Sequence, residues 1–433
     1  MVEDEEKAVR SAPVERTISN TDAPVLYHDA DGNFNPPDRG LLAWSQVLAT
    51  LLINAMCWGY PAAYGVYQLY YVETLNLPSS QVSWIGSIQI FLTFGICTVS
   101  GRLSDAGYTR HCVVGGCGLA VLGTFMVSLA TKYWQIFLAQ GVCTGLGLGV
   151  AFMPAITTLS SYFKRNRAFA LAIAATGTSV GSIIFPSIVQ YLIPKVGFPW
   201  AVRCAAFVAL FIVGVANLLL KPYLPPRKAG PLVEWGAFKE RTYALFTLGA
   251  FCNFYTLYFG FFYINSYART VIGFSSQEAV SMILIANALG IPARIVVGYL
   301  ADNLLGPINM YLISLCYLGT ITYVWMTIQT RAAMYIFSVF YGLAVGATQG
   351  VYVGALASLT SDPQKMGTRF GMVSTLSGFA TLAGPPTVGA IIDQSGGEYK
   401  WAQVWGGTLA FGAALAVFAS RTAAVGLKFK ARL

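Results

Sequence analysis

The sequence predicts an all-α integral membrane protein: twelve transmembrane helices in two six-helix bundles related by a pseudo-two-fold axis. The composition, the number of long apolar runs and a motif that recurs in both halves support this fold class. Of the 433 residues, 56% are hydrophobic and only 10% are charged, and the mean hydropathy is +0.60. Soluble domains carry about 25% charged residues. This composition excludes a soluble globular protein.

Twelve apolar runs approach or exceed the roughly 20 residues that a helix needs to cross a membrane. Six precede a polar stretch and six follow it, at 43–72, 82–100, 111–131, 134–161, 168–193, 200–220, 243–267, 277–300, 307–328, 332–358, 369–392 and 401–420. We therefore expect five parts. They are a disordered acidic cytoplasmic tail at 1–42, an N-terminal bundle at 43–220, a cytoplasmic linker at 221–241, a C-terminal bundle at 242–421 and a short basic cytoplasmic end at 422–433.

The charge distribution indicates how the chain is oriented. Nine of the 18 acidic residues lie in the first 43 positions, which net −5, so the remaining chain carries +14. Twelve lysines and arginines lie in the linker and the loops on the side that would hold both termini. The opposite loops carry only Lys132, Lys195, Arg269, Arg331 and Lys400. Because cytoplasmic loops are enriched in Lys and Arg, both termini are expected in the cytoplasm, and the basic charge indicates topology rather than nucleic-acid binding. We expect the plasma membrane, with the vacuole as an alternative.

A short motif closes the second helix of each half. The first copy is Gly101-Arg102-Leu103-Ser104-Asp105, and the second is Gly298-Tyr299-Leu300-Ala301-Asp302. Each aspartate can accept hydrogen bonds from backbone N–H groups at the start of a neighbouring helix, or pair with a loop arginine such as Arg110. We predict gating contacts at these ends, whereas a plain helix-end charge near water is the alternative.

One permanent cation, Arg294, lies inside the apolar run at 283–302. It is eight residues from Asp302, or roughly 12 Å along a helix. An arginine at this depth costs at least about 2.5–3.5 kcal/mol unless it finds a partner or a wet cavity. Outside the tail, every acidic residue falls at a helix end or in a loop. Water, polar side chains, backbone carbonyls freed at Pro292, or an anionic ligand are therefore the candidate partners, and the guanidinium fork suits a carboxylate. A structural arginine bonded to neighbouring helices is the alternative.

Several further motifs resemble those of the major facilitator superfamily, and within it the fungal branch of the monocarboxylate porter family. The segment Asp38-Arg39-Gly40-Leu41-Leu42-Ala43-Trp44 resembles the entry to helix 1 of these porters, and Gly101-x-Leu103-x-Asp105 resembles the loop 2–3 motif. The other matches are Tyr162-Phe163, Arg165, Arg167, Ala170, Ala174, Gly177 and Gly181 in helix 5, and Ala383-Gly384-Pro385-Pro386-x-x-Gly389 in helix 11. The resemblance covers nearly the whole chain after the tail.

The resemblance implies two rocking bundles with a central site, in which the helix 8 arginine, here Arg294, binds a substrate carboxylate. Helices 1 and 7 border that site in the superfamily. Helical spacing puts Tyr60, Tyr64, Tyr67 and Tyr71 on one face of helix 1, and Phe251, Tyr255, Tyr258 and Phe262 on one face of helix 7. These faces are predicted either to line the site or to pack in the core. Asn287 lies on the same helical face as Arg294 and is a further candidate ligand.

Two departures from the animal porters argue against classical proton-coupled lactate transport. Tyr60-Pro61 is followed by Ala62 where those porters have a lysine, and Gly290 stands where they have an aspartate four residues before the arginine. No acidic residue or histidine lies within the predicted helices away from their ends, so we expect a uniporter or a weakly coupled transporter, with protons as a candidate second partner.

We therefore expect a facilitative or secondary-active transporter of a small organic anion, such as a monocarboxylate or an exported secondary metabolite. A transporter of a neutral or aromatic molecule such as a vitamin is one alternative, and a non-transporting nutrient receptor is another. No metal cluster, nucleophile–base pair or phosphate loop is evident, so no enzymatic activity, metal or cofactor is expected. The expected partners are the substrate and the lipid bilayer, and the expected functional unit is a monomer.

Overall fold

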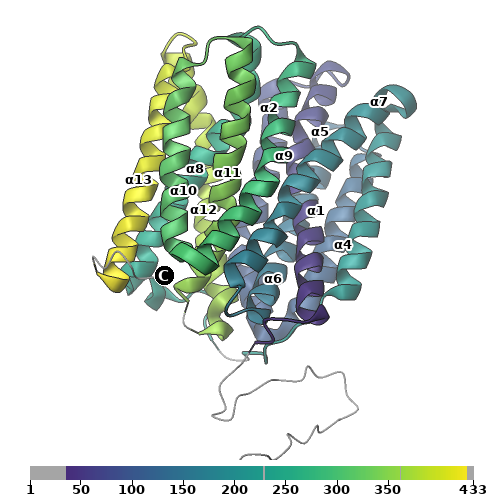
Figure 1. The fold of residues 1–433 in the computed structure, drawn as a ribbon. Coiled ribbons are helices and arrows are strands. Elements are labelled where there is room, and N and C mark those ends of the chain that lie inside the picture. Colours follow the sequence, from purple (N-terminus) through teal and green to yellow (C-terminus); the bar gives the residue numbers. More distant parts are fainter. Residues whose placement is uncertain (1–35, 228–229, 361, 427–433) are drawn as a thin grey trace, which may run out of the picture.

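The described part of the chain is almost entirely helical. The computed structural model describes residues 36–227, 230–360 and 362–426 (Figure 1). Residues 1–35 of the predicted disordered tail and 427–433 of the basic C-terminal end therefore lie outside the described residues. Residues 36–42 of that tail are described: Leu41 and Leu42 begin the first helix, and the Asp38 carboxylate accepts hydrogen bonds from the backbone N–H groups of Lys164 and Arg165. The predicted all-α membrane fold is confirmed.

The N-terminal bundle is built from seven α-helices and two short π-helical segments. They are α1 Leu41–Glu73, α2 Ser79–Gly95, α3 Cys97–Leu103, η1 Ser104–Tyr108, α4 Thr109–Val127, α5 Tyr133–Ile136, η2 Phe137–Thr144, α6 Gly145–Tyr162 and α7 Arg167–Leu219. Several of these segments follow one another without a loop, so η2 and α6 together form one crossing, as do α2 and α3.

The C-terminal bundle follows the linker, which contains the short helix η3 at Trp235–Lys239. Its elements are α8 Arg241–Thr270, α9 Ser276–Leu300, η4 Ala301–Leu305, α10 Pro307–Val324, η5 Trp325–Thr327, α11 Arg331–Ser358, η6 Pro363–Lys365, α12 Met366–Gln394 and α13 Lys400–Val425. Helix α13 continues four residues beyond the boundary that the sequence predicts for this bundle.

Ten continuous helical runs in the described residues are apolar and long enough to cross a membrane. Two of them, Gln81–Val127 with 47 residues and Arg167–Leu219 with 53, are long enough to cross twice. Each contains a glycine at positive φ, Gly107 at 94° and Gly197 at 77°, where the chain reverses direction. The structure therefore contains the twelve predicted crossings.

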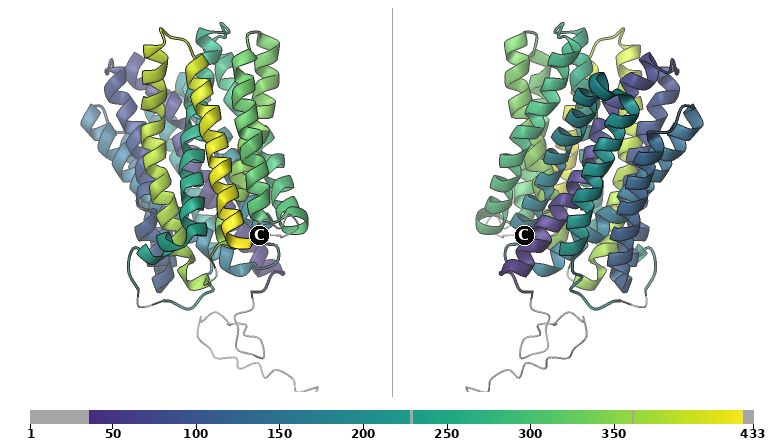
Figure 2. Two further views of the ribbon diagram at one scale, coloured as in Figure 1. Left: turned by 90° about the vertical axis from the view of Figure 1, so that its left-hand side faces the viewer. Right: turned by 90° about the vertical axis from the view of Figure 1, so that its right-hand side faces the viewer.

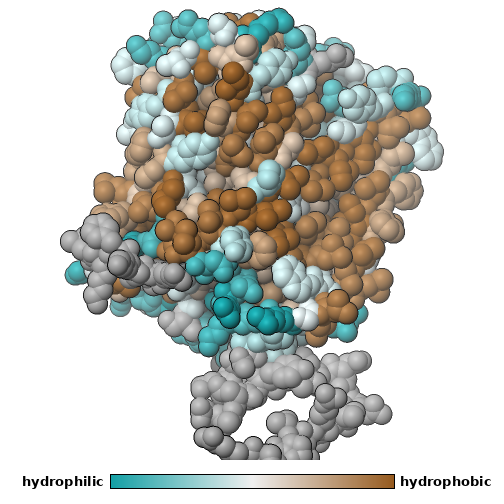
Figure 3. Space-filling view, viewed as in Figure 1, coloured by the Kyte–Doolittle hydropathy of each residue, from teal (hydrophilic) through white to brown (hydrophobic). Residues whose placement is uncertain are grey.

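The start of α1 and the end of α13 lie at the same end of the molecule, as an even number of crossings requires (Figures 1 and 2). We call this the terminal end. Hydrophobic residues cover most of the middle of the visible face, and hydrophilic residues gather near its two ends (Figure 3). This distribution matches an apolar bilayer core between two aqueous faces.

The two bundles pack against each other along two seams. In one seam α12 lies against α2 and α3, and in the other α9 lies against α7. The helices approach each other closely in both seams. A Cβ added at Gly101 would lie 2.0 Å from the carbonyl oxygen of Gly367, and one added at Gly298 would lie 2.4 Å from the Cβ of Ala172. Small residues thus allow the two halves to meet along helix backbones, as in other membrane bundles.

Candidate functional site

Arg294 lies on α9, where it faces the interior of the protein and is only 2% exposed. Its Nη1 donates a hydrogen bond to the hydroxyl of Ser179 on α7, and its Nη2 donates one to the side-chain oxygen of Gln349 on α11. Its Nε is buried without a hydrogen-bond partner. Ser179 belongs to the N-terminal bundle, so the guanidinium bridges the two halves of the protein.

Neither partner of Arg294 carries a negative charge. Within the described residues no carboxylate forms a salt bridge with this guanidinium, and the partners are side chains rather than the carbonyls near Pro292. Polar side chains were one of the predicted solutions. Two neutral acceptors leave most of the five guanidinium donors without a partner, and they do not neutralise the charge.

A cavity of about 210 Å³ adjoins Arg294. It is lined by Ser179, Phe261, Ala286, Asn287, Gly290, Arg294, Tyr341, Gly342, Val345 and Gly346. The hydroxyl of Tyr341 is buried and has no partner, and the amide nitrogen of Asn287 donates to the carbonyl of Ile283. The lining therefore combines a cation, a hydroxyl and an amide with an apolar wall. Only about 10 Å³ of this is free space, roughly enough for one water molecule, so the cavity is too small for a substrate in the present conformation.

Glycines fix the position of Arg294 relative to α11. A Cβ at Gly342 would lie 2.4 Å from the carbonyl oxygen of Ala286, and one at Gly350 would lie 2.9 Å from the Cα of Arg294. Gly346 similarly lies against Gly290. Because these three glycines let the backbones of α9 and α11 approach closely, the two helices carry the arginine as one closely packed pair.

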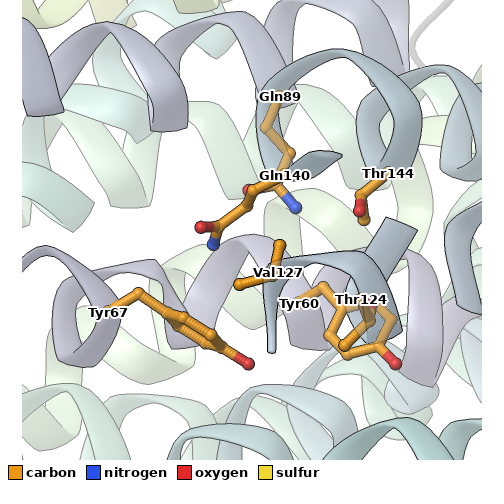
Figure 4. Close-up of a pocket in the computed structure, with 7 residues that line it drawn as sticks. All are labelled: Tyr60, Tyr67, Gln89, Thr124, Val127, Gln140 and Thr144. Atoms are coloured by element: carbon orange, nitrogen blue, oxygen red, sulfur yellow. The ribbon is translucent and has the colours of Figure 1, made fainter. Parts of the chain in front are cut away.

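The predicted tyrosine face of helix 1 lies elsewhere. Tyr60 and Tyr67 line a second cavity of about 220 Å³ within the N-terminal bundle, facing Gln89 and Gln140 across it (Figure 4). The hydroxyl of Tyr64 donates to the carbonyl of Val82 on the neighbouring helix. In the present conformation these three tyrosines pack inside their own bundle and do not line the cavity at Arg294, which corresponds to the core-packing alternative for this face. Periodicity identifies a shared face but not the helix that the face meets.

The two tyrosines predicted on the seventh transmembrane helix, which is α8 in the structure, have different surroundings. Tyr255 donates or accepts a hydrogen bond with Thr387 at 2.9 Å and packs on Trp405, so it faces its own bundle. Tyr258 is buried and its ring lies 6.5 Å from that of Phe94, which belongs to the other half. Neither lines the cavity, which instead takes Phe261 from the same helix.

At the terminal end, Asp105 joins the N-terminal bundle to the first turn of α12. Its Oδ1 accepts a hydrogen bond from the backbone N–H of Gly367 at 2.9 Å, and its Oδ2 accepts bonds from the backbone N–H and hydroxyl of Thr368, both at 2.7 Å. A carboxylate at a helix N-terminus satisfies free N–H groups and interacts favourably with the helix dipole.

Asp302 makes the reciprocal contact from the C-terminal bundle. Its oxygens accept hydrogen bonds from the backbone N–H groups of Ala168 at 3.2 Å and Phe169 at 2.7 Å, in the first turn of α7. Each aspartate therefore caps a helix of the opposite half, at the second and third residues of that helix. The repeated motif predicts either hydrogen bonds to the start of a neighbouring helix or a pair with a loop arginine. Both aspartates make the hydrogen bonds to a helix start.

Arg110 does not take part in these contacts. It is exposed at the start of α4 and is not among the partners of Asp105, whose carboxylate oxygens are occupied by the first turn of α12. The contact of the Asp105 carboxylate with Gly367 and Thr368 therefore takes the place of a pairing with Arg110. The backbone carbonyl of Asp105 separately accepts a hydrogen bond from the backbone N–H of Arg227 in the linker, at 2.7 Å.

The sequence does not predict the lining residues Ser179, Phe261 and Tyr341 or the Arg294 partner Gln349. Gln349 could have been noticed, because a glutamine inside an apolar helical run is costly without a partner. Ser179 lies between Gly177 and Gly181, a pattern that indicates close helix packing and not a polar contact.

The comparisons with known proteins agree with this architecture. The family model described as Major Facilitator Superfamily matches residues 47–385. The chain belongs to the major facilitator superfamily. It is therefore a membrane transporter and not an enzyme. An MFS-type transporter of Gibberella zeae is 37% identical over 376 residues, which cover 86% of this chain and 85% of that protein.

Other relatives of this superfamily member have more specific names. The aspyridones efflux protein of Emericella nidulans is 35% identical over 391 residues, covering 88% of this chain and 80% of that protein. Among solved structures, the human organic anion transporter MFSD10 matches with a TM-score of 0.70 and 16% identity, covering 89% of this chain and all of that chain. At this identity the structural likeness shows the fold alone.

Proposed function

We propose that this transporter exports a small organic anion, such as a monocarboxylate or a carboxylated secondary metabolite, and that Arg294 binds its anionic group. The observation that carries this proposal is a guanidinium that is 2% exposed, adjoins a cavity and has only neutral partners among the described residues. An uncompensated buried charge is costly, and an incoming carboxylate would remove that cost.

The other cavity groups favour an anion with an apolar or aromatic body. Phe261 and Val345 provide an apolar wall, and the free hydroxyl of Tyr341 and the amide of Asn287 can orient a second polar group. A carboxylate larger than lactate could contact this wall only after the cavity widens, because the free space holds about one water molecule in the present conformation.

Alternating access would use the two aspartate contacts as gates. We place the terminal end in the cytoplasm, on the strength of the Lys and Arg asymmetry between the loops. Asp105 and Asp302 then hold the cytoplasmic ends of the two halves together in the present conformation. Opening toward the cytoplasm requires both contacts to break, while the halves rock about the central site.

The names of similar proteins favour export over import. A protein that is 35% identical over most of its length is named for the efflux of aspyridones. From this similarity we propose the same direction of transport for this chain, and we expect it to lie in the plasma membrane. Acidic groups in the described helices lie at the helix ends, which supports a uniporter or weakly coupled mechanism over a proton relay.

The test measures efflux from loaded proteoliposomes for a panel of radiolabelled carboxylates and their neutral methyl esters. Arg294→Lys keeps the charge but loses the fork, and Arg294→Ala loses both. We expect Arg294→Lys to reduce carboxylate efflux strongly and Arg294→Ala to abolish it. Arg203→Ala is the matched control, because Arg203 bonds Ser128 and packs on Trp200, away from the cavity.

Normal carboxylate efflux by folded Arg294→Ala protein would exclude the anion site. Efflux of the methyl esters at the rate of the acids, unchanged by either substitution, would instead favour a neutral substrate on the same fold.

A further inference from the structure

The hydrogen bond between Arg294 and Ser179 is a contact between the two halves and not only a contact within the cavity. Arg294 belongs to the C-terminal bundle and Ser179 to the N-terminal bundle. It lies in the same α7–α9 seam as the Asp302 contact, eight residues further from the terminal end along α9, or about 12 Å. Any separation of this seam must break both contacts.

The other seam has a neutral counterpart at a similar level. There the hydroxyl of Thr98, seven residues from Asp105, donates to that of Thr375 at 2.8 Å, and Thr375 also bonds the carbonyls of Phe94 and Gly95. Both seams therefore hold an aspartate contact at the terminal end and a polar contact deeper in the protein. In only one seam does the deeper contact involve a charged group that also lines the cavity.

Ser179 cannot follow Arg294 when the halves move apart. Its side chain is fully buried, and the glycines on either side of it lock α7 to α1. A Cβ at Gly177 would lie 2.0 Å from the carbonyl oxygen of Leu51, and one at Gly181 would lie 1.8 Å from that of Ala55. The hydroxyl is thus a fixed acceptor on the N-terminal bundle.

An anion is a stronger acceptor than this hydroxyl for the same guanidinium. The Ser179 hydroxyl is a single neutral acceptor, whereas a carboxylate carries the opposite charge and can take two parallel N–H groups of an arginine. A carboxylate that binds Nη1 and Nη2 in parallel would therefore compete with Ser179 for Nη1 of Arg294. Loss of the hydrogen bond to Ser179 removes one contact between the halves from the conformation in which the terminal end is closed.

We propose that the Arg294–Ser179 hydrogen bond is a latch between the two bundles, and that the anionic group of the substrate releases it. This proposal rests on the proposed function, because it takes the ligand of Arg294 to be an anion. Ser179 is then a positioning residue: it holds the empty site closed at the terminal end and yields its place to the substrate. By linkage, a weaker latch also changes the affinity for the anion.

The experiment reports opening of the terminal end directly. Met366 at the start of α12 is 1% exposed and lies between the halves, where the hydroxyl of Ser160 donates to its sulfur at 3.2 Å. A Met366→Cys reporter is introduced in full-length protein whose partly exposed cysteines, Cys143, Cys204, Cys252 and Cys316, are replaced by serine. The rate of maleimide modification in nanodiscs then follows the population of the open state.

Ser179→Ala should raise the modification rate roughly tenfold, because a hydrogen bond to a charged group is lost from the closed state alone. Ser338→Ala is the matched control. It removes a fully buried hydroxyl whose hydrogen bond, to the sulfur of Met282, lies within the C-terminal half, so the rate should stay close to that of the native protein. Thermal unfolding checks that each variant is folded.

Benzoate is the anionic probe and benzamide its neutral control. Benzoate should raise the modification rate of the native reporter and change that of Ser179→Ala little, because the latch is already absent; benzamide should have no effect. Equal rates for native and Ser179→Ala protein without ligand would overturn the latch, even if carboxylate efflux still depends on Arg294. A raised rate in Ser179→Ala with no response of the native protein to benzoate would overturn release by an anion and would also count against the proposed anion site.

Discussion

Gly290 lies directly against the guanidinium of Arg294. A Cβ at this position would sit 2.9 Å from Nη1 of Arg294 and 3.2 Å from the hydroxyl oxygen of Ser179. The absent side chain therefore provides the space in which the arginine meets the N-terminal bundle. It also leaves this cation without a carboxylate one helical turn away.

Gly290→Ala should weaken carboxylate transport by displacing the guanidinium by a few tenths of an ångström. We expect an affinity about tenfold lower, which corresponds to about 1.4 kcal/mol, with little change in the maximal rate. The measurement is the substrate dependence of efflux. Gly115→Ala on α4 is the control, since a Cβ there meets nothing within 4 Å.

Gly290→Asp sharpens the same test, because it places an acid beside Arg294. An ionised internal carboxylate would neutralise the arginine and compete with the substrate, so carboxylate transport at neutral pH should fall further than in Gly290→Ala and should recover in acid, while the protein remains folded. Carboxylate transport by Gly290→Asp that is undiminished at neutral pH and independent of pH would contradict the assignment of Arg294 as the anion site.

Gly101→Ala should disfavour the conformation described here. The added methyl group would meet the backbone carbonyl of Gly367 at 2.0 Å, and a backbone atom cannot move aside cheaply. Because this contact joins the two halves, the terminal end should stay open: the Met366→Cys reporter should react at least about tenfold faster, and transport should fall. Gly118→Ala on α4 should change neither, since that position is open. Slow modification of a folded Gly101→Ala protein would show that the halves can close without this contact.

Features that depend on residues close together in the sequence could be predicted from it. The helices follow from the length of the apolar runs, and Arg294 stands out as a cation within one of them. The repeated Gly-x-Leu-x-Asp motif predicts reciprocal contacts at the helix ends, and Asp105 and Asp302 make such contacts. In each case a few neighbouring residues carry the whole signal.

Contacts that depend on the register between distant helices could not be predicted. Tyr60 and Tyr67 share a face, but only the packing of α1 in its bundle decides that this face meets Gln89 and Gln140. Ser179 is 115 residues from Arg294 in the sequence. Its role follows from the way α7 and α9 are placed side by side, and a serine within a glycine-containing helix does not indicate that by itself.

Asp105→Asn and Asp302→Asn should each favour opening of the terminal end. The amide keeps the shape but loses the charge that interacts with a helix N-terminus, an effect of about 0.3–2 kcal/mol, and its NH₂ group cannot accept a second hydrogen bond. We expect the Met366→Cys reporter to react several-fold faster in either variant. Since both contacts must break in one motion, the double variant should exceed each single one. Arg110→Ala should leave the rate unchanged, because Arg110 makes no contact with Asp105.

Glu234 should stabilise the linker at neutral pH and lose that effect in acid. Its carboxylate accepts hydrogen bonds from Lys365 at 2.7 Å and from Arg369 at 3.4 Å. Burial alone would raise the pKa of Glu234, but the hydrogen bond from Lys365 and the two nearby positive charges hold it below its usual value of about 4.3. A lowered folded-state pKa adds stability above the unfolded pKa, and this is lost as the pH falls through the folded value.

Glu234→Gln should therefore lower the thermal midpoint by about 1–2 °C at pH 7, the effect of roughly 1 kcal/mol in a protein of this size. The difference from the native protein should shrink as the pH falls below about 4. The measurement is the midpoint of both proteins across this pH range. Glu398→Gln, in an exposed loop, is the control and should match the native protein throughout. A difference that persists undiminished at pH 3 would mean that Glu234 acts through packing and not through its charge.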